Sequence, residues 1–463
     1  MIERLSSGND RLDQILNGGV LKNSINLIVG VPGSGKTILS QQFAFHNATA
    51  EHPALYLSTL SEPLDKILRF GETLKVFDRE AVRAGRVIYE DLGQVLGSEG
   101  LENILVAVER YLKELHPGMV VIDSFRAFHA VASDATEFRR FLYGLTRLLS
   151  ASATTAVWNA PYTREQAPEE AEFAVADGII ALDIKRVGSR EVRVMQILKL
   201  RGSSYRSGEH AYRITDEGFE VFPRLADRQD QAPYELTPER TSTGIDALDK
   251  VLGDGGYWSG SATMVAGPSG IGKTLMGLHF LFHGAASGQP GIHATFQENE
   301  TQLIRVAKSF GWSFDGSGVH ILSRSVVDIL IDEWVYQLLD LIEKTGAKRI
   351  VIDSLPDVMV AAADPARFRE WMFSLTQRLE RAGISMMMIV EVPELFQLRR
   401  ISEQGLSHLA DNVVLLQYVQ EGPELARALT VLKTRAMHHH PVVHRYEITE
   451  KGFVLGDVLS ITR

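Results

Sequence analysis

The sequence contains no cysteine among its 463 residues. This absence excludes disulfide bonds, thiolate zinc sites and catalysis by a thiol. The chemistry of the chain must therefore come from oxygen and nitrogen side chains.

Long apolar runs are missing as well. The longest apolar stretches, such as residues 386–390, fall well short of the roughly 20 residues that span a bilayer. Residues 1–8 show neither a basic start with an apolar core nor an Arg-rich amphipathic pattern. These absences argue against a transmembrane protein and predict a cytoplasmic one.

The sequence also lacks an excess of positive charge. It has 48 Lys and Arg against 58 Asp and Glu, which gives a formal net charge of −10. A general electrostatic grip on nucleic acid needs a basic surface, so nucleic acid is not the expected partner. A local basic groove that forms in an assembled oligomer remains an alternative.

What the sequence does contain is a long internal repeat. The segment SGNDRLD at residues 7–13 recurs as TGIDALD at residues 243–249, and ITDEGF at 214–219 returns as ITEKGF at 448–453. Matches in the same order along the chain indicate an internal duplication. Because the period is far too long for a solenoid, each copy is predicted to be a complete domain.

The repeats divide the chain into a first domain at residues 1–224, a linker at 225–240 and a second domain at 241–463. Residues 223–240 are rich in Pro, Gln and mixed charges, which is typical of an exposed linker. Within each copy, short β-branched apolar runs alternate with longer helical patterns. This rhythm predicts α/β domains with a mostly parallel twisted sheet flanked by helices.

Both copies carry a Walker A phosphate loop, Gly-x-x-x-x-Gly-Lys-Thr, between an apolar run and a helical pattern. Glycines let backbone N–H groups converge on phosphate oxygens, and the lysine reaches the β- and γ-phosphates. A turn that binds nothing does not explain why Lys-Thr follows both times. The predicted ATP-binding residues are Gly30, Gly33, Ser34, Gly35, Lys36 and Thr37 in the first copy, and Gly267, Ser269, Gly270, Gly272, Lys273 and Thr274 in the second.

An acidic residue at a strand end is the expected partner of a phosphate loop, since it holds the metal. Asp123 and Asp353 each close a short apolar run at matching positions of the two copies. With Thr37 and Thr274 they are the predicted ligands of Mg²⁺. The competing interpretation is that each aspartate merely caps a helix.

Hydrolysis needs a carboxylate that orients or deprotonates the attacking water. Glu298 follows its lysine by 25 residues, and in the first copy the nearest carboxylate at that place is Glu62. Both are predicted catalytic residues beside Lys36 and Lys273. For Glu62, a solvated surface glutamate is an equal alternative.

Paired cations recur near the end of each copy. Lys199 and Arg201, like Lys433 and Arg435, lie two residues apart in strand-like runs, which places each pair on one face. Such pairs are suited to the γ-phosphate of ATP on a neighbouring subunit, in the manner of an arginine finger. The alternative is that they are solvated charges on an edge strand.

Taken in order, these residues resemble the KaiC family of circadian-clock ATPases within the RecA-like superfamily, over nearly the whole chain. Residues 201–204 (RGSS) and 414–419 (VLLQYV) are also similar to segments of that family. The resemblance implies two tandem RecA-like P-loop NTPase domains in a double-layered homohexamer with ATP between subunits. It further implies hydrolysis in the first layer, Ser/Thr autokinase and phosphatase activity in the second, and a KaiB-like or other signalling protein as partner.

The chain departs from the family pattern at several positions. The family's adjacent glutamates are replaced by Leu60-Ser61 before Glu62 in the first copy and by Gln297-Glu298 in the second, and an amide cannot accept a proton as a carboxylate does. The phosphoacceptor pair Ser-Thr reads Ser407-His408, which leaves Ser407 with Ser402 as a second candidate. The chain ends at Arg463 without the extended tail of clock relatives, which argues against regulation by KaiA.

Two alternatives come from other functional classes. A DNA-dependent motor of the RecA or DnaB kind would use the same core, but the acidic balance and the lack of a basic loop with interleaved aromatics argue against it. The second alternative is a signalling scaffold, which would bind ATP in order to assemble and would hydrolyse it only weakly. The altered glutamates motivate this alternative. Ser407 also has the ordinary alternative of a hydroxyl at a helix or turn.

Overall fold

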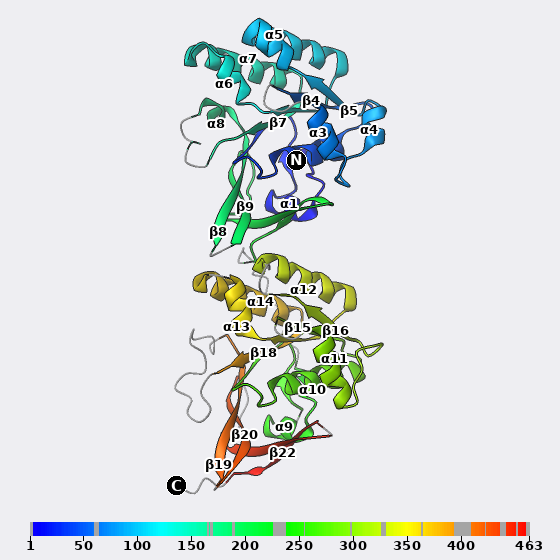
Figure 1. Cartoon of the computed structure of the whole chain (residues 1–463), viewed down its shortest axis with the longest axis vertical. Helices are drawn as coiled ribbons and strands as arrows, with labels where there is room; N and C mark the ends of the chain where they lie inside the picture. Colours follow the sequence, from blue (N-terminus) through cyan, green and yellow to red (C-terminus); the bar gives the residue numbers. More distant parts are fainter. Residues whose placement is uncertain are drawn as a thin grey trace. The chain divides into compact units, whose positions relative to one another are not determined.

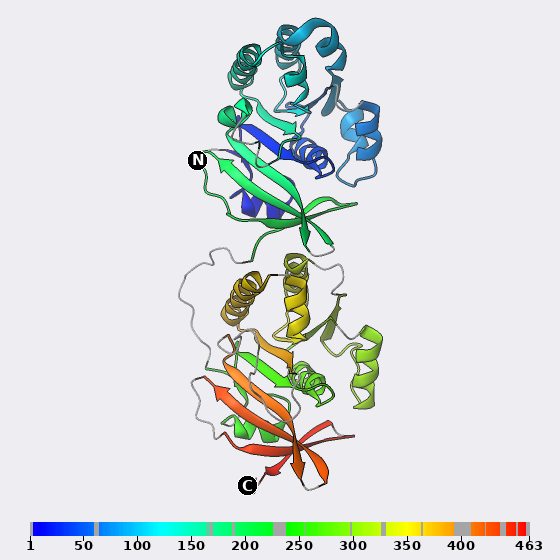
Figure 2. The same cartoon turned by 60° about the vertical axis from the view of Figure 1, so that its left-hand side comes forward.

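The chain folds as two compact units, residues 1–227 and 228–463 (Figures 1 and 2). The computed structural model describes residues 3–59, 64–163, 166, 170–187, 190–225, 238–253, 255–296, 299–325, 330–362, 364–392, 409–421, 423–435, 441–450 and 452–459. Most of the predicted linker at 225–240 lies outside these residues.

Unit 1 is built on a nine-stranded sheet in the order β5-β4-β6-β7-β3-β8-β9-β10-β11. The strands from β5 to β8 pair in parallel, and those from β8 to β11 pair in antiparallel fashion. The strands are β3 (Ile25–Gly30), β4 (Ala54–Ser58), β5 (Val87–Asp91), β6 (Met119–Asp123), β7 (Thr155–Ala160), β8 (Gly178–Val187), β9 (Arg190–Leu200), β10 (His210–Thr215) and β11 (Gly218–Phe222), with a separate pair of β1 (Arg4–Leu5) and β2 (Val20–Leu21).

Helices cover both faces of this sheet, as the period-2 alternation of the strands requires. Leu27 of β3 packs into the core on one face, and its neighbour Ile28 packs into the core on the other. The helices are α1 (Asp10–Ile15), α2 (Lys36–Asn47), α3 (Leu64–Gly71), α4 (Arg79–Arg83), α5 (Gly93–Leu115), α6 (Ala127–Val131), α7 (Ala135–Ala151) and α8 (Ala171–Val175).

Local sequence explains where these helices begin. The carboxylate of Asp134 accepts hydrogen bonds from the N–H groups of Thr136 and Glu137 at 2.7 and 2.8 Å, so α7 starts at the next residue. Apolar residues at helical spacing then face the core, including Phe138, Leu142, Leu145 and Leu149.

Unit 2 repeats the same plan, with sheet order β16-β15-β17-β18-β14-β19-β20-β21-β22. Its strands are β14 (Ala262–Gly267), β15 (Gly291–Thr295), β16 (Val319–Ser323), β17 (Arg349–Asp353), β18 (Ser385–Glu391), β19 (Asn412–Glu421), β20 (Glu424–Thr434), β21 (Val443–Thr449) and β22 (Gly452–Val458), with β12 (Arg240–Thr241) paired to β13 (Tyr257–Trp258). Its helices are α9 (Asp246–Val251), α10 (Lys273–Ala286), α11 (Glu300–Ser309), α12 (Ile331–Thr345), α13 (Leu355–Ala362) and α14 (Pro365–Arg381).

The predicted fold class is confirmed: each unit is a mostly parallel sheet between helices. The carboxyl ends of the parallel strands in each unit meet at one edge, which is where such sheets bind ligands. None of the described helices has both the length and the apolar character needed to cross a membrane.

Candidate nucleotide sites

Each phosphate loop joins the central strand of its sheet to the helix behind it. In unit 1, β3 ends at Gly30 and α2 begins at Lys36. Gly35 caps the helix with φ at 92°, and a Cβ there would lie 2.6 Å from Cδ1 of Ile214. Gly272 does the same in unit 2, with φ at 106° and 2.7 Å to Cδ1 of Ile448. Only glycine suits this conformation and this space.

Each phosphate loop brings its backbone N–H groups and the N-terminus of the following helix to one anion-binding position. Gly33 and Gly270 also have positive φ, at 80° and 73°, and a Cβ on either would meet no atom within 4 Å. Successive N–H groups in such a turn converge on an anion, and the helix dipole adds partial positive charge. The geometry is therefore suited to phosphate at both loops.

The two lysines fold over their own loops. Lys36 Nζ donates to the carbonyls of Gly30 and Val31 at 2.8 and 3.0 Å, and Lys273 Nζ donates to the carbonyl of Pro268 at 2.8 Å. Burial lowers the pKa of both ammonium groups, while nearby carboxylates oppose this shift, Asp123 for Lys36 and Glu391 most strongly for Lys273. Each loop thus encloses one partly desolvated cation, whose pull on an anion is stronger than that of a solvated lysine.

Each predicted metal ligand pair lies in contact. Thr37 Oγ1 donates to Asp123 Oδ2 at 2.7 Å, and Thr274 Oγ1 donates to Asp353 Oδ2 at the same distance. Asp123 is the last residue of β6, and Asp353 is the last residue of β17. Each is followed by a cis peptide bond to a serine. A hydroxyl and a carboxylate beside a phosphate loop are the oxygen ligands that Mg²⁺ prefers, so these residues fit the ion.

The two aspartates differ in their second neighbour. Tyr56 of β4, fully buried, donates its phenol proton to Asp123 Oδ2 at 2.7 Å. At the matching position of β15 stands His293, whose Nε2 lies 3.9 Å from Asp353 Oδ2. Burial lowers the pKa of His293 to about 4 and raises that of Asp353. The Asp123 carboxylate is therefore held by two donors and the Asp353 carboxylate by one, within the described residues.

In each unit, a tyrosine on one of the antiparallel strands, β10 or β21, donates a hydrogen bond to the backbone of the phosphate loop. Tyr212 Oη donates to the Ser34 carbonyl at 2.6 Å, and Tyr446 Oη donates to the Ile271 carbonyl at 2.6 Å. Each ring stacks on a phenylalanine of the next strand, Phe219 or Phe453, with ring centres 4.4 and 4.2 Å apart. Neither tyrosine is among the site residues predicted from the sequence, although each stands two residues before the repeated Ile-Thr.

Removing either phenol should loosen its loop. For Tyr212→Phe and Tyr446→Phe we expect the free energy of unfolding to fall by about 1–2 kcal/mol each, because a loop carbonyl loses its partner. We also expect weaker ATP binding at the altered loop. Urea unfolding and ATP titration measure the two effects, with Tyr143→Phe as control because that side chain is 63% exposed. Equal results for all three variants would contradict a supporting role.

The residue that holds the phenylalanine differs between the units. In unit 1 the Phe219 N–H donates to Gln42 Oε1 at 3.2 Å, and in unit 2 the Phe453 N–H donates to His279 Nε2 at 2.9 Å. Gln42 and His279 occupy the same turn of α2 and α10, six residues after the lysine. Burial lowers the pKa of His279 to about 4 from an ordinary 6.5.

This difference predicts acid sensitivity in unit 2. Between pH 6.5 and about 4 the unfolded chain binds a proton at His279 that the folded chain does not, so acidification favours unfolding by up to about 1.4 kcal/mol per pH unit. The variant His279→Gln, which copies unit 1, should remove this part of the pH dependence. Urea unfolding at pH 7 and pH 5 checks it by tryptophan fluorescence, since four of the five tryptophans lie in unit 2. An unchanged difference between the two pH values would contradict the assignment.

The predicted cation pairs lie at the carboxyl ends of β9 and β20. Lys199 Nζ and Arg201 Nη2 both donate to the Ala174 carbonyl, at 3.3 and 3.2 Å. Arg201 also pairs with Asp177 at 3.3 Å, as Arg435 pairs with Asp411 at 3.0 Å, while Lys433 donates to the Ala410 carbonyl at 2.7 Å. Arg201 and Arg435 are 56% and 66% exposed, which leaves each guanidinium accessible to a further anion.

Four predicted residues lie outside the described residues, namely Glu62, Glu298, Ser402 and Ser407. Gln297 and His408 do so as well. Their roles stay predictions.

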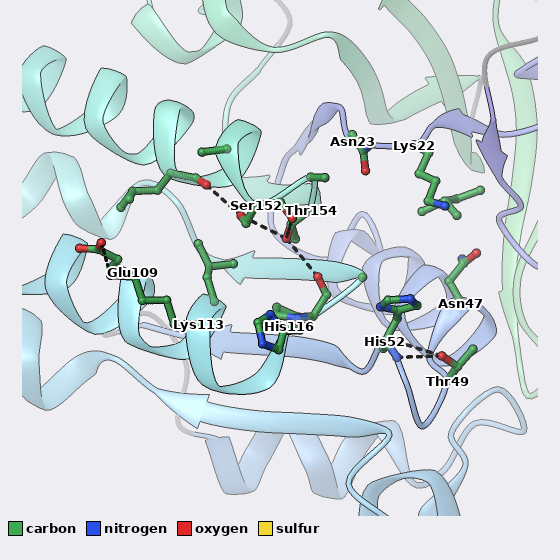
Figure 3. Close-up of a pocket in the computed structure, with 17 residues that line it drawn as sticks. Lys22, Asn23, Asn47, Thr49, His52, Glu109, Lys113, His116, Ser152 and Thr154 are labelled. Carbon is green, nitrogen blue, oxygen red and sulfur yellow. Dashed lines mark hydrogen bonds and ion pairs between the residues drawn. The ribbon is translucent and has the colours of Figure 1, made fainter.

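A cavity of about 850 Å³ opens at the opposite edge of the sheet in unit 1 (Figure 3). Its lining includes Asn23, His52, Gly118 and Thr154, which lie one or two residues before β3, β4, β6 and β7. The phosphate loop instead follows the carboxyl end of β3. The cavity is therefore separate from the nucleotide site.

Comparison with known protein families agrees with this geometry. The family model described as "ATPase: KaiC" matches residues 5–226 and 241–458, which covers both units and includes both phosphate loops. The chain belongs to the KaiC family. It is accordingly an ATPase with two tandem family domains, as the resemblance in the sequence implied.

Individual relatives match along nearly the whole chain. The circadian clock oscillator protein KaiC of a Picosynechococcus strain is 27% identical over 477 residues, which cover 98% of this chain and 90% of the relative. That of Acaryochloris marina is 28% identical over 465 residues, covering 95% and 86%. The circadian clock protein KaiC3 of Synechocystis is 26% identical over 475 residues, covering 98% and 92%.

Proposed function

We propose that this KaiC-family chain binds ATP with Mg²⁺ at both phosphate loops and hydrolyses it as a timer in signalling of the circadian-clock type. The contact of a loop threonine with a strand-end aspartate, present at 2.7 Å in both units, is the observation that carries the proposal. The names of the relatives, which are clock proteins, support the signalling role.

The residues divide the work at each loop. Backbone N–H groups and Lys36 or Lys273 bind the β- and γ-phosphates, and Thr37 with Asp123, or Thr274 with Asp353, holds Mg²⁺. The ion, when bound, neutralises charge that develops on the phosphate oxygens. Glu62 and Glu298 are the candidates for orienting the attacking water, which needs a carboxylate beside the γ-phosphate.

We further propose a cytoplasmic homohexamer with ATP between subunits. The exposed guanidinium groups of Arg201 and Arg435 support it, because each can approach the γ-phosphate of ATP held by a neighbour. Each subunit would carry the nucleotide on one face and the cations for its neighbour's nucleotide on another face. Contacts of this head-to-tail kind can close into a ring. In the second domain, Ser407 and Ser402 are the candidate acceptors for autophosphorylation, and a KaiB-like or other signalling protein is the candidate partner.

One experiment tests the enzyme and the kinase together. Purified protein is incubated with γ-labelled ATP and Mg²⁺, and released phosphate and protein-bound label are followed in parallel. We expect released phosphate, with label that is lost in Ser407→Ala combined with Ser402→Ala. Absence of label would reject the autokinase and leave the ATPase standing. Negligible turnover, unchanged in Glu62→Ala and Glu298→Ala, would instead support the ATP-assembled scaffold.

A further inference from the structure

Three donor side chains of unit 1 gather beside the nucleotide site without belonging to it. His129 lies on α6, Glu172 on α8, and Glu170 directly before α8. His129 Nε2 lies 3.2 and 3.3 Å from the two carboxylate oxygens of Glu172, and 3.7 Å from Oε2 of Glu170. One ligand atom from each residue falls within 4.8 Å of the others.

The cluster joins two carboxylates to one imidazole, with a phenol and a guanidinium nearby. Glu172 is fully buried, and its Oε1 accepts the phenol proton of Tyr162. The guanidinium of Arg126 lies 5.6 Å from the centre of the Tyr162 ring. One imidazole, one nearby guanidinium and a phenol thus surround two carboxylates, and a fully buried carboxylate such as that of Glu172 is normally paired or coordinates a metal.

The histidine is held in place for such a role. Its ring stacks on Phe138 of α7 with centres 3.6 Å apart and an angle of 28° between planes. This packing directs Nε2 toward the carboxylates rather than toward solvent. A fixed imidazole beside two carboxylates is a common ligand set of divalent transition ions.

The distances between donors agree with one shared ion. Metal–ligand bonds of about 2.0–2.2 Å in tetrahedral geometry place donor atoms roughly 3.3–3.6 Å apart. The observed separations from His129 Nε2, 3.2 to 3.7 Å, span this interval. The distances from the imidazole nitrogen therefore suit a shared ion, and the three ligand atoms lie within 4.8 Å of one another.

We propose that His129, Glu170 and Glu172 of unit 1 bind a divalent transition ion such as Zn²⁺ or Mn²⁺, at a site distinct from the Mg²⁺ of the nucleotide. The imidazole nitrogen selects against Mg²⁺, which takes oxygen ligands. The inference goes beyond the proposed function and does not depend on hydrolysis.

The imidazole of this site is not repeated at the matching position of unit 2. Counted from the strand-end aspartates, Met359 of α13 stands where unit 1 has His129. A thioether is a weak partner for Zn²⁺ or Mn²⁺. The duplication therefore supplies an internal reference without the imidazole.

An ion here would fasten two segments that flank the nucleotide site. α6 follows the strand that ends in Asp123, and α8 carries the carbonyls of Phe173 and Ala174, which accept from Lys199. By joining α6 to α8 the ion would position the cation pair. His129, Glu170 and Glu172 are accordingly positioning residues.

The test uses the full chain with ATP and excess Mg²⁺, titrated with Co²⁺, whose visible absorption reports imidazole and carboxylate ligands. The three consecutive histidines 438–440 are replaced by alanine in every sample to remove weak binding there. We expect one Co²⁺ per chain that Zn²⁺ displaces. His129→Gln, which keeps a hydrogen-bonding side chain, and Glu170→Gln should each weaken binding by about tenfold or more.

The exposed His52 supplies the matched control, and His52→Gln should bind Co²⁺ like the parent. Circular dichroism shows whether each variant is folded, and Glu170→Gln, at a side chain 28% exposed, serves if His129→Gln is not. Equal Co²⁺ spectra and affinities in parent and folded variants would overturn the site and leave a histidine–carboxylate ion pair only. ATP retention, measured alongside, reports separately on the proposed function.

Discussion

The double substitution Lys36→Ala with Lys273→Ala is expected to remove ATP retention and to lower hydrolysis by about 100- to 1000-fold. Each ammonium lies inside its loop, bonded to loop carbonyls at 2.8 Å, in a site that water reaches poorly. No other described lysine is placed on either loop, so no neighbour can take over the charge. Filter retention of labelled ATP and phosphate release measure the two effects.

The single substitutions separate the two loops. Lys36→Ala and Lys273→Ala should each halve the bound ATP if both loops are occupied. Lys22→Ala is the control, because that lysine pairs with Glu3 at 2.6 Å on the surface. ATP retention by the double variant equal to that of Lys22→Ala would contradict binding at the loops.

Asparagine at the strand-end aspartates is expected to have the second largest effect. Asp123→Asn and Asp353→Asn keep the size of the side chain and an acceptor for the threonine hydroxyl, but they remove the negative charge that binds Mg²⁺. We expect hydrolysis at the altered site to fall by about 100-fold, with ATP binding reduced less. Phosphate release measured over a range of Mg²⁺ concentrations checks this.

The control for these variants is Asp364→Asn, at an aspartate that caps α14 and can be replaced by another good cap. It should leave the Mg²⁺ dependence unchanged. If Asp123→Asn and Asp353→Asn behave like Asp364→Asn, the helix-cap interpretation of the strand-end aspartates is the right one.

Much of the fold could be predicted from the sequence, because the duplication reveals every local pattern twice. A repeated Gly-Lys-Thr loop between a strand and a helix predicts a phosphate-binding loop in each copy. The parallel sheet is predicted by apolar runs that alternate with helical patterns. The contact of Thr37 with Asp123 follows from the same rule, since both stand at the carboxyl edge of the sheet.

The features that could not be predicted from the sequence depend on contacts between distant segments. Tyr212 reaches Ser34 across 178 positions, and no local pattern predicts such a pair. The difference between Gln42 and His279 was hidden for the same reason, because each acts through the backbone of a strand near the end of its unit. His129, Glu170 and Glu172 are scattered in ordinary surroundings, and only the fold brings them together.

The tyrosine support also bears on how the protein is made. The hydrogen bonds from Tyr212 and Tyr446 connect residues 178 and 175 positions apart, which is most but not all of the length of a unit. A chain emerging from the ribosome therefore synthesises each phosphate loop long before the hairpin that braces it. Until that hairpin has emerged the loop lacks this hydrogen bond and should bind nucleotide more weakly, so a chain cut before Tyr212 carries the loop without its support.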